Sequence, residues 1–211
     1  MPQSQRVISE IIQSGNSPVS TESGRVHLSD NAVYRPVPAS ESYNGVGFSS
    51  MPKPQLVGYD ATTARQIWLL ELDEIKTGFA WDELHGQKFV CLCAMDASSI
   101  ARDDLSRFCS HLINLGCAYF CVWGPDCERA HDIMDEEAIG DNPPATDIGC
   151  LMTTWHAKES LVAAVDFFLN CTIPDEKYAP AGCPYGLAVA VGSRGWAKEI
   201  EQQLRLATAA D

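Results

Sequence analysis

The sequence FVCLCAMD at residues 89–96, with SSIARDDLSRFCSHLINLG at residues 98–116, decides the fold. The first run is apolar up to its last residue, which is typical of a strand buried on both faces of a sheet. In the second run, apolar residues recur at positions 101, 105, 108, 109, 112 and 113, the spacing of one face of a helix. Ser98 or Ser99 can cap this helix, and Gly116 can end it. Together the two runs predict a buried strand followed by an amphipathic helix.

The same pair of patterns recurs along the chain. Apolar runs at residues 118–124, 147–155 and 185–193 are each followed by a helical pattern, and a further strand is predicted at residues 65–72. Apolar strands that alternate with amphipathic helices predict a parallel sheet covered on both faces. We therefore expect a three-layer, Rossmann-like α/β fold with a mostly parallel sheet of four to five strands in a flavodoxin-like order. The expected order is 118–124, 89–96, 147–155 and 185–193, with residues 65–72 at an edge.

Residues 1–58 differ from the rest of the chain in composition. They are rich in Ser, Pro, Gly and Asn, which predicts a flexible or extended N-terminal segment before a single α/β domain at residues 59–211. Acidic and basic residues balance in this segment, so that the whole net charge of -13 falls on the domain. Such a surface repels a phosphate backbone, so no nucleic acid is expected as a partner, whereas a basic protein partner is compatible with it.

The cysteines and the hydropathy indicate a location. The nine cysteines include no C-x-x-C pair, and most of them lie inside apolar runs, where cysteine acts as a small hydrophobic side chain. No signal peptide is visible at the start, and no apolar run is long enough to span a membrane. We therefore expect a cytoplasmic protein with free thiols and no contact with a membrane.

Polar side chains cluster at the predicted carboxyl ends of the strands, where open parallel sheets bind ligands. Cys127 begins a helix, where the helix dipole can lower the pKa of a thiol, and it is the candidate nucleophile. His156 is then the candidate base, and Asp96 or Asp126 orients it. Against this, Asp126 and Glu128 flank the thiol and oppose the dipole, and Cys127 shares a helix face with apolar residues, so that a structural thiol explains it as well.

Two other kinds of site fit the same edge of the sheet. Glu128 and His131 stand three residues apart on one helix face and are candidate metal ligands, although an acidic solvent-facing surface gives the same pattern. Ser193 and Arg194 follow a strand and open a helix, which suits an anion, although helix capping by Ser193 explains them too. The candidate ligand-binding residues are Asp126, Thr154, Ser193 and Arg194.

Familiar motifs are missing from the sequence. It contains no G-x-G-x-x-G, P-loop or G-x-S-x-G pattern, so no cofactor is predicted and an α/β-hydrolase is disfavoured. The runs VWGPDCERAHDIMDE (122–136) and TTWHAKESLVAAVDFFL (153–169) resemble a family of uncharacterised bacterial Rossmann-like domains, over residues 85–205. The resemblance implies a prokaryotic α/β domain that stands alone, and it brings neither an activity nor catalytic residues.

Three functions are compatible with these features. The first is a non-enzymatic binding or regulatory module with an acidic surface for a protein partner, and a bacterial defence or immunity role suits its charge and small size. The second is a small hydrolase or transferase that uses Cys127 and His156 or a metal held by carboxylates. The third is a nucleotide-sensing domain, by analogy of fold alone. A small-molecule ligand is compatible with each of them.

Overall fold

The computed structural model of the chain describes residues 51–77, 79–140, 149–178 and 182–209. Six strands form one sheet in the order β1-β2-β6-β3-β4-β5. β1 pairs antiparallel with β2, and all other neighbouring strands are parallel. The strands are β1 (Gln55–Asp60), β2 (Arg65–Leu72), β3 (Phe89–Ala94), β4 (Cys117–Trp123), β5 (Met152–His156) and β6 (Tyr185–Val191). The predicted α/β fold with a mostly parallel sheet is confirmed.

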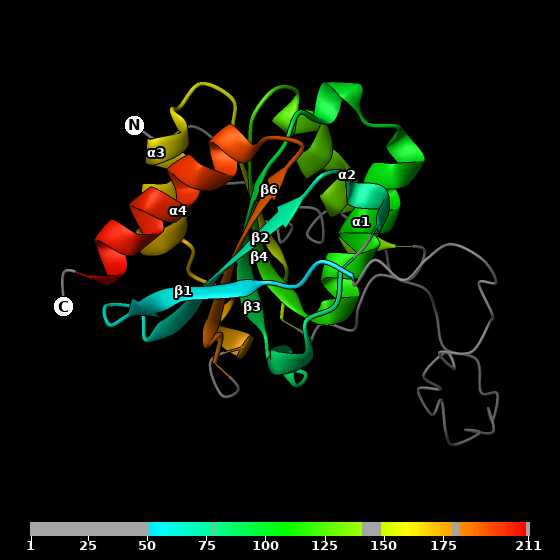
Figure 1. Ribbon diagram of the computed structural model, residues 1–211. Helices are drawn as coiled ribbons and strands as arrows, with labels where there is room; N and C mark the ends of the chain where they lie inside the picture. Colours follow the sequence, from blue (N-terminus) through cyan, green and yellow to red (C-terminus); the bar gives the residue numbers. More distant parts are fainter. Residues whose placement is uncertain (1–50, 78, 141–148, 179–181, 210–211) are drawn as a thin grey trace, which may run out of the picture.

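Four helices cover the two faces of the sheet, as Figure 1 shows. They are α1 (Arg102–Leu115), α2 (Cys127–Ile139), α3 (Leu161–Asn170) and α4 (Arg194–Thr208). The buried side chains of α1 and α2 share a core with one face, and those of α3 and α4 share a second core with the other. β3 is buried at all its positions because its alternate side chains enter the two cores in turn.

The expected number of strands was wrong. The sheet has six strands rather than four to five, because residues 55–60 form β1 at the edge beside β2. This strand is partly exposed and follows two prolines, Pro52 and Pro54, so that it lacks the apolar run of a central strand. Residues 65–72 consequently do not lie at the edge.

The expected strand order was also wrong. β3 lies between β4 and β6, and not between β4 and β5. After β5 the chain returns through α3 on the opposite face from α1 and α2, and β6 enters the sheet between β2 and β3. Sequence periodicity describes each strand locally and contains little about such distant pairings, so the order was not readable from it.

Glycine and serine residues in the sequence predicted some of the helix ends correctly. Gly116 has a φ of 105° and ends α1 as predicted, because this backbone conformation suits glycine. α1 begins at Arg102, whereas Ser98 and Ser99 belong to a short 3-10 helix (Ala97–Ser99) whose start is capped by Asp96. Ser193 caps α4 by accepting a hydrogen bond from the backbone N–H of Trp196.

The predicted N-terminal segment lies mostly outside the described residues. Residues 1–50 are not described, and residues 55–58 are part of β1. Of the helices in the described part of the chain, none combines the length and the apolar character needed to cross a membrane.

Candidate functional site

A cavity opens where the order of the strands reverses. From β3 the chain continues outward to β4 and β5, whereas β6 lies on the other side of β3. The connections that follow β3 and β6 therefore lead to helices on opposite faces and leave a gap between them, which is where open α/β sheets bind ligands. The cavity has a volume of about 630 Å³, and residues that follow the carboxyl ends of β2, β3 and β6 supply its walls.

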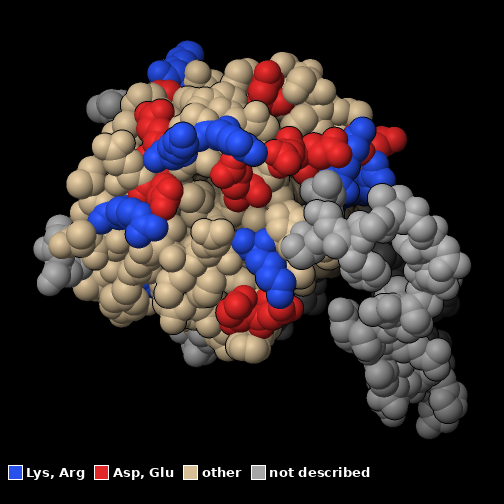
Figure 2. All heavy atoms as spheres, in the orientation of Figure 1, with Lys and Arg blue, Asp and Glu red and all other residues tan. Residues whose placement is uncertain are grey.

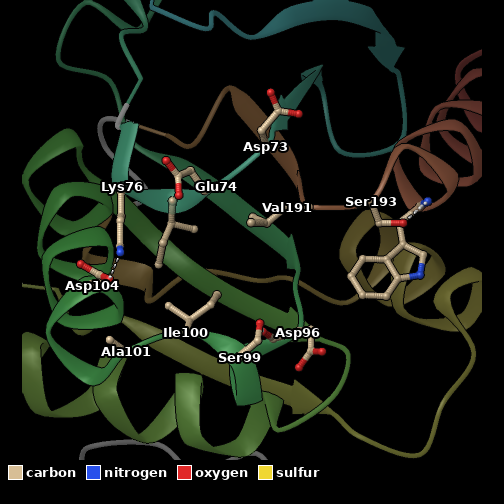
Figure 3. Close-up of a pocket in the computed structure, with 13 residues that line it drawn as sticks. Asp73, Glu74, Lys76, Asp96, Ser99, Ile100, Ala101, Asp104, Val191 and Ser193 are labelled. Atoms are coloured by element: carbon tan, nitrogen blue, oxygen red, sulfur yellow. Dashed lines mark hydrogen bonds and ion pairs between the residues drawn. The ribbon is translucent and has the colours of Figure 1, made fainter.

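The walls of this cavity are acidic. Four carboxylate side chains line it, and one lysine is the only basic residue among them. Lys76 is already paired, because its Nζ lies 3.2 Å from Oδ2 of the buried Asp104, which also binds Arg107. Figure 3 shows this ion pair at one side of the cavity, with Asp73 and Asp96 on other sides. Asp73 and Asp96 add further negative charge to the cavity.

Asp96 is held in place by the segment that follows β3. Its Oδ1 accepts hydrogen bonds from the backbone N–H of Ser98, at 3.1 Å, and from the Ser98 hydroxyl, at 2.5 Å. These bonds use one carboxylate oxygen and start the short 3-10 helix. Asp96 is therefore a fixed charge in the wall, as expected of a rigid binding site.

The start of α4 forms the opposite wall. Ser193 and Trp196 line the cavity there, and the Trp196 ring packs edge-on against Trp123, with ring centroids 5.4 Å apart. Arg194, which was predicted to bind a ligand together with Ser193, does not line the cavity. Arg194 has a side chain that is 85% exposed, and its Nε lies 3.7 Å from Oε1 of Glu71, outside the cavity. The structure thus brings Ser193 to the cavity together with Asp96, but not Arg194.

The side chains of Cys127 and His156 are not brought together, although the Cys127 thiol lies beside the backbone of His156. Cys127 is buried in the core beneath α1 and α2, and burial raises the pKa of its thiol although nearby backbone N–H groups oppose the shift. The His156 ring lies on the other face of the sheet, against Phe167 at a centroid distance of 4.6 Å and 3.4 Å from the Thr154 hydroxyl. Burial lowers the pKa of His156. The two side chains cannot exchange a proton across the sheet.

The residues predicted to bind a metal are also separated. His131 is 1% exposed, and its ring nitrogens lie 3.0 Å from the Thr153 hydroxyl and 3.2 Å from Oδ1 of Asp132. Glu128 is exposed in the first turn of α2. Asp126 lies 3.5 Å from Arg129 on the surface. In the described part of the chain, no three or more His, Cys, Asp or Glu side chains are grouped so as to hold a metal ion.

Several cavity residues were missed at the sequence level. Asp73, Glu74 and Lys76 directly follow the buried strand β2, in the same way that Asp96 follows β3. A signal was therefore present, since the rule that selects strand ends applies equally to residues 73–76. It was overlooked because β2 was expected at an edge of the sheet rather than beside β6.

Comparison with known proteins identifies a family. A family model described as a domain of unknown function (DUF7684) matches residues 69–207. This range contains every residue that lines the cavity. No curated protein and no solved structure matches the chain.

Proposed function

The chain belongs to the DUF7684 family, and we propose that it is a non-enzymatic binding domain whose cavity binds a small molecule with a positively charged amino or guanidino group. The observation that carries this proposal is the acidic cavity at the carboxyl ends of β2, β3 and β6. Its place at the reversal of the strand order is the usual ligand site of such sheets, and its lining selects the charge of the ligand.

Charge favours a cation in this cavity. The carboxylates of Asp73 and Asp96 come from two separate connections, and the only lysine in the walls is neutralised by Asp104. A charge-assisted hydrogen bond to one of these carboxylates contributes about 1.5–3 kcal/mol, whereas a phosphate or carboxylate ligand meets repulsion. The proposal therefore favours an amine over a nucleotide.

Part of the lining is apolar. Ile75, Ile100, Val191 and the ring of Trp196 supply hydrophobic surface to the cavity. Sites for small organic molecules combine such walls with a few polar groups, and a tryptophan face also attracts cations. The ligand should accordingly carry an apolar or aromatic part in addition to its charge.

The volume favours a small molecule over a protein. A cavity of about 630 Å³ matches typical ligand sites, which span roughly 300–1,000 Å³. A basic side chain from the protein partner expected from the sequence has the same chemistry and is the other source of a cation.

The mostly parallel sheet with helices on both faces supports a Rossmann-like arrangement. A bacterial source, a cytoplasmic location and a defence or immunity role remain predictions from the sequence.

The proposal is tested by comparing the binding of small organic cations with that of an organic anion of similar size. We would titrate the full chain with phenethylamine and agmatine, and with phenylpropionate as an anion of similar size, by isothermal titration calorimetry. Both amines should bind at a single site, phenylpropionate should not, and added salt should weaken binding. The proposal fails if neither amine binds at millimolar concentration or if the anion binds equally well.

A pair of variants locates the site. Asp73→Asn removes one cavity carboxylate and should weaken amine binding about 10-fold, equivalent to about 1.4 kcal/mol. Glu128→Gln makes the same change of charge on the exposed surface of α2 and should leave the affinity unchanged. Equal losses in both variants would mean that amines bind only through the net charge.

A further inference from the structure

Among the described residues, β1 forms one edge of the sheet. Its inner side pairs with β2, and among the described residues no strand pairs with its outer side. An edge of this kind presents backbone N–H and C=O groups that can pair with another strand. Natural proteins often protect such edges with charged side chains, but residues 55–59 of β1 carry none.

An irregularity in β1 aligns two of its apolar side chains. Leu56 lies opposite Trp68 of β2, and Tyr59 lies opposite Gln66, with a shift of register between Leu56 and Gly58. Since Trp68 and Gln66 are two residues apart on β2, they share a face, and Leu56 and Tyr59 share it too. Leu56 is 55% exposed and Tyr59 is 53% exposed.

The surroundings of β1 are electrically mixed, although the chain has a net charge of -13. The shallow hollow between β1 and α4 has both signs in its lining: Lys53, Lys198, Arg205, Glu71 and Glu201. In Figure 2, the lower left part of this face, where β1 runs, consists mostly of residues that are neither acidic nor basic. Two copies of this acidic chain can therefore approach along β1 where basic side chains accompany the carboxylates, and these mixed charges can pair across a two-fold axis.

From these observations we propose that β1 pairs antiparallel with β1 of a second copy, so that one sheet continues through a two-fold dimer. In this pairing Leu56 faces Tyr59 of the partner subunit, and Tyr59 faces the partner subunit's Leu56. The same contact thus forms twice, as an isologous interface requires. Cross-strand pairs of an aromatic and an aliphatic side chain stabilise antiparallel strands. The interface lies away from the acidic cavity and does not depend on its function.

The mass of the full chain in solution tests the dimer. Light scattering after size-exclusion chromatography should give twice the 23.0 kDa chain mass, with dissociation on dilution. The double variant Leu56→Lys/Tyr59→Lys should be monomeric, because two like charges then meet across the axis. Leu206→Lys changes a leucine on α4 that is 61% exposed and should leave the dimer intact. A monomeric wild type, a dimeric double variant or an equally dissociated Leu206→Lys would each overturn the proposal.

Hydrogen exchange gives a second test that needs no variant. Amide protection of residues 55–60 should increase when the wild-type concentration rises from about 1 to about 100 μM, because dimer formation follows mass action. Unchanged low protection would overturn the proposal. High protection at every concentration in a chain that light scattering finds monomeric would also overturn it, since the edge would then be covered within one chain.

Discussion

At the scale of single residues, Cys127 shows how burial competes with a helix dipole. It occupies the first turn of α2, where backbone N–H groups lower the pKa of its thiol. Burial acts in the opposite direction and is the larger effect, so that the pKa is raised. The thiol therefore stays protonated at neutral pH, which is the state of a core side chain rather than of a nucleophile.

Thiol labelling checks this conclusion. In the native protein, Ellman's reagent should react first with Cys171, which is exposed, and at least about 100-fold more slowly with Cys127, which is buried. Cys171→Ala should remove the fast phase, and Cys127→Ala should leave it unchanged. Loss of the fast phase in Cys127→Ala would instead identify Cys127 as an accessible and reactive thiol.

At the scale of elements, the sequence predicts those strands and helices whose buried positions recur with a fixed period. β3 and α1 were predictable because a strand buried on both faces and a helix buried on one face have distinct apolar patterns. β1 was not, because a short, half-exposed edge strand has no such pattern. Its pairing with β2 depends on tertiary contact more than on its own residues.

The candidate site was predictable to a similar degree. The rule that ligands bind at strand ends predicted that Asp96 and Ser193 lie at one edge of the sheet, and both line the cavity because β3 and β6 are neighbours and end on the same side. It could not predict that the His156 side chain points to the face opposite Cys127. This depends on which residues of β5 face each core, and a shift by one residue reverses every side chain.

The turn between β4 and α2 has little room for a side chain. Gly124 has a φ of 122°, and a Cβ atom at this position would lie 2.2 Å from the carbonyl oxygen of Met95. Gly124→Ala should therefore lower the free energy of unfolding by about 3 kcal/mol or more, measured by urea denaturation, since backbone must move. Gly86 has a φ of 75° and no heavy atom within 4 Å of an added Cβ, so Gly86→Ala should cost only about 1–2 kcal/mol. Equal losses would contradict this steric explanation.

At the scale of the whole molecule, the buried thiols determine how stability depends on pH. Burial raises the pKa values of Cys91, Cys93 and Cys121, and it raises that of Cys109 from 9.0 to about 12. Above pH 9 the unfolded chain therefore loses thiol protons that the folded chain retains. The unfolded state binds fewer protons, so that stability must fall as the pH rises.

Urea denaturation as a function of pH measures this effect. The free energy of unfolding should be insensitive to the thiols below about pH 8 and should fall steeply between pH 9 and 12, the interval over which the Cys109 pKa is displaced. In Cys109→Ala, the free energy of unfolding should fall less steeply with pH, because one thiol proton no longer distinguishes the folded from the unfolded state. An identical slope in wild type and variant would show that Cys109 does not contribute.

The position of β6 also has a consequence for how the chain is made. β6 follows all the other described strands in the sequence, yet it lies between β2 and β3. A nascent chain released only as far as β5 therefore holds β1–β2 and β3–β4–β5 as two separate pieces, each with an open apolar edge. The ligand cavity has no wall from β6 at that time. A ligand of the proposed kind therefore meets a complete cavity only after residue 191 has emerged, and the two open edges stay exposed until then.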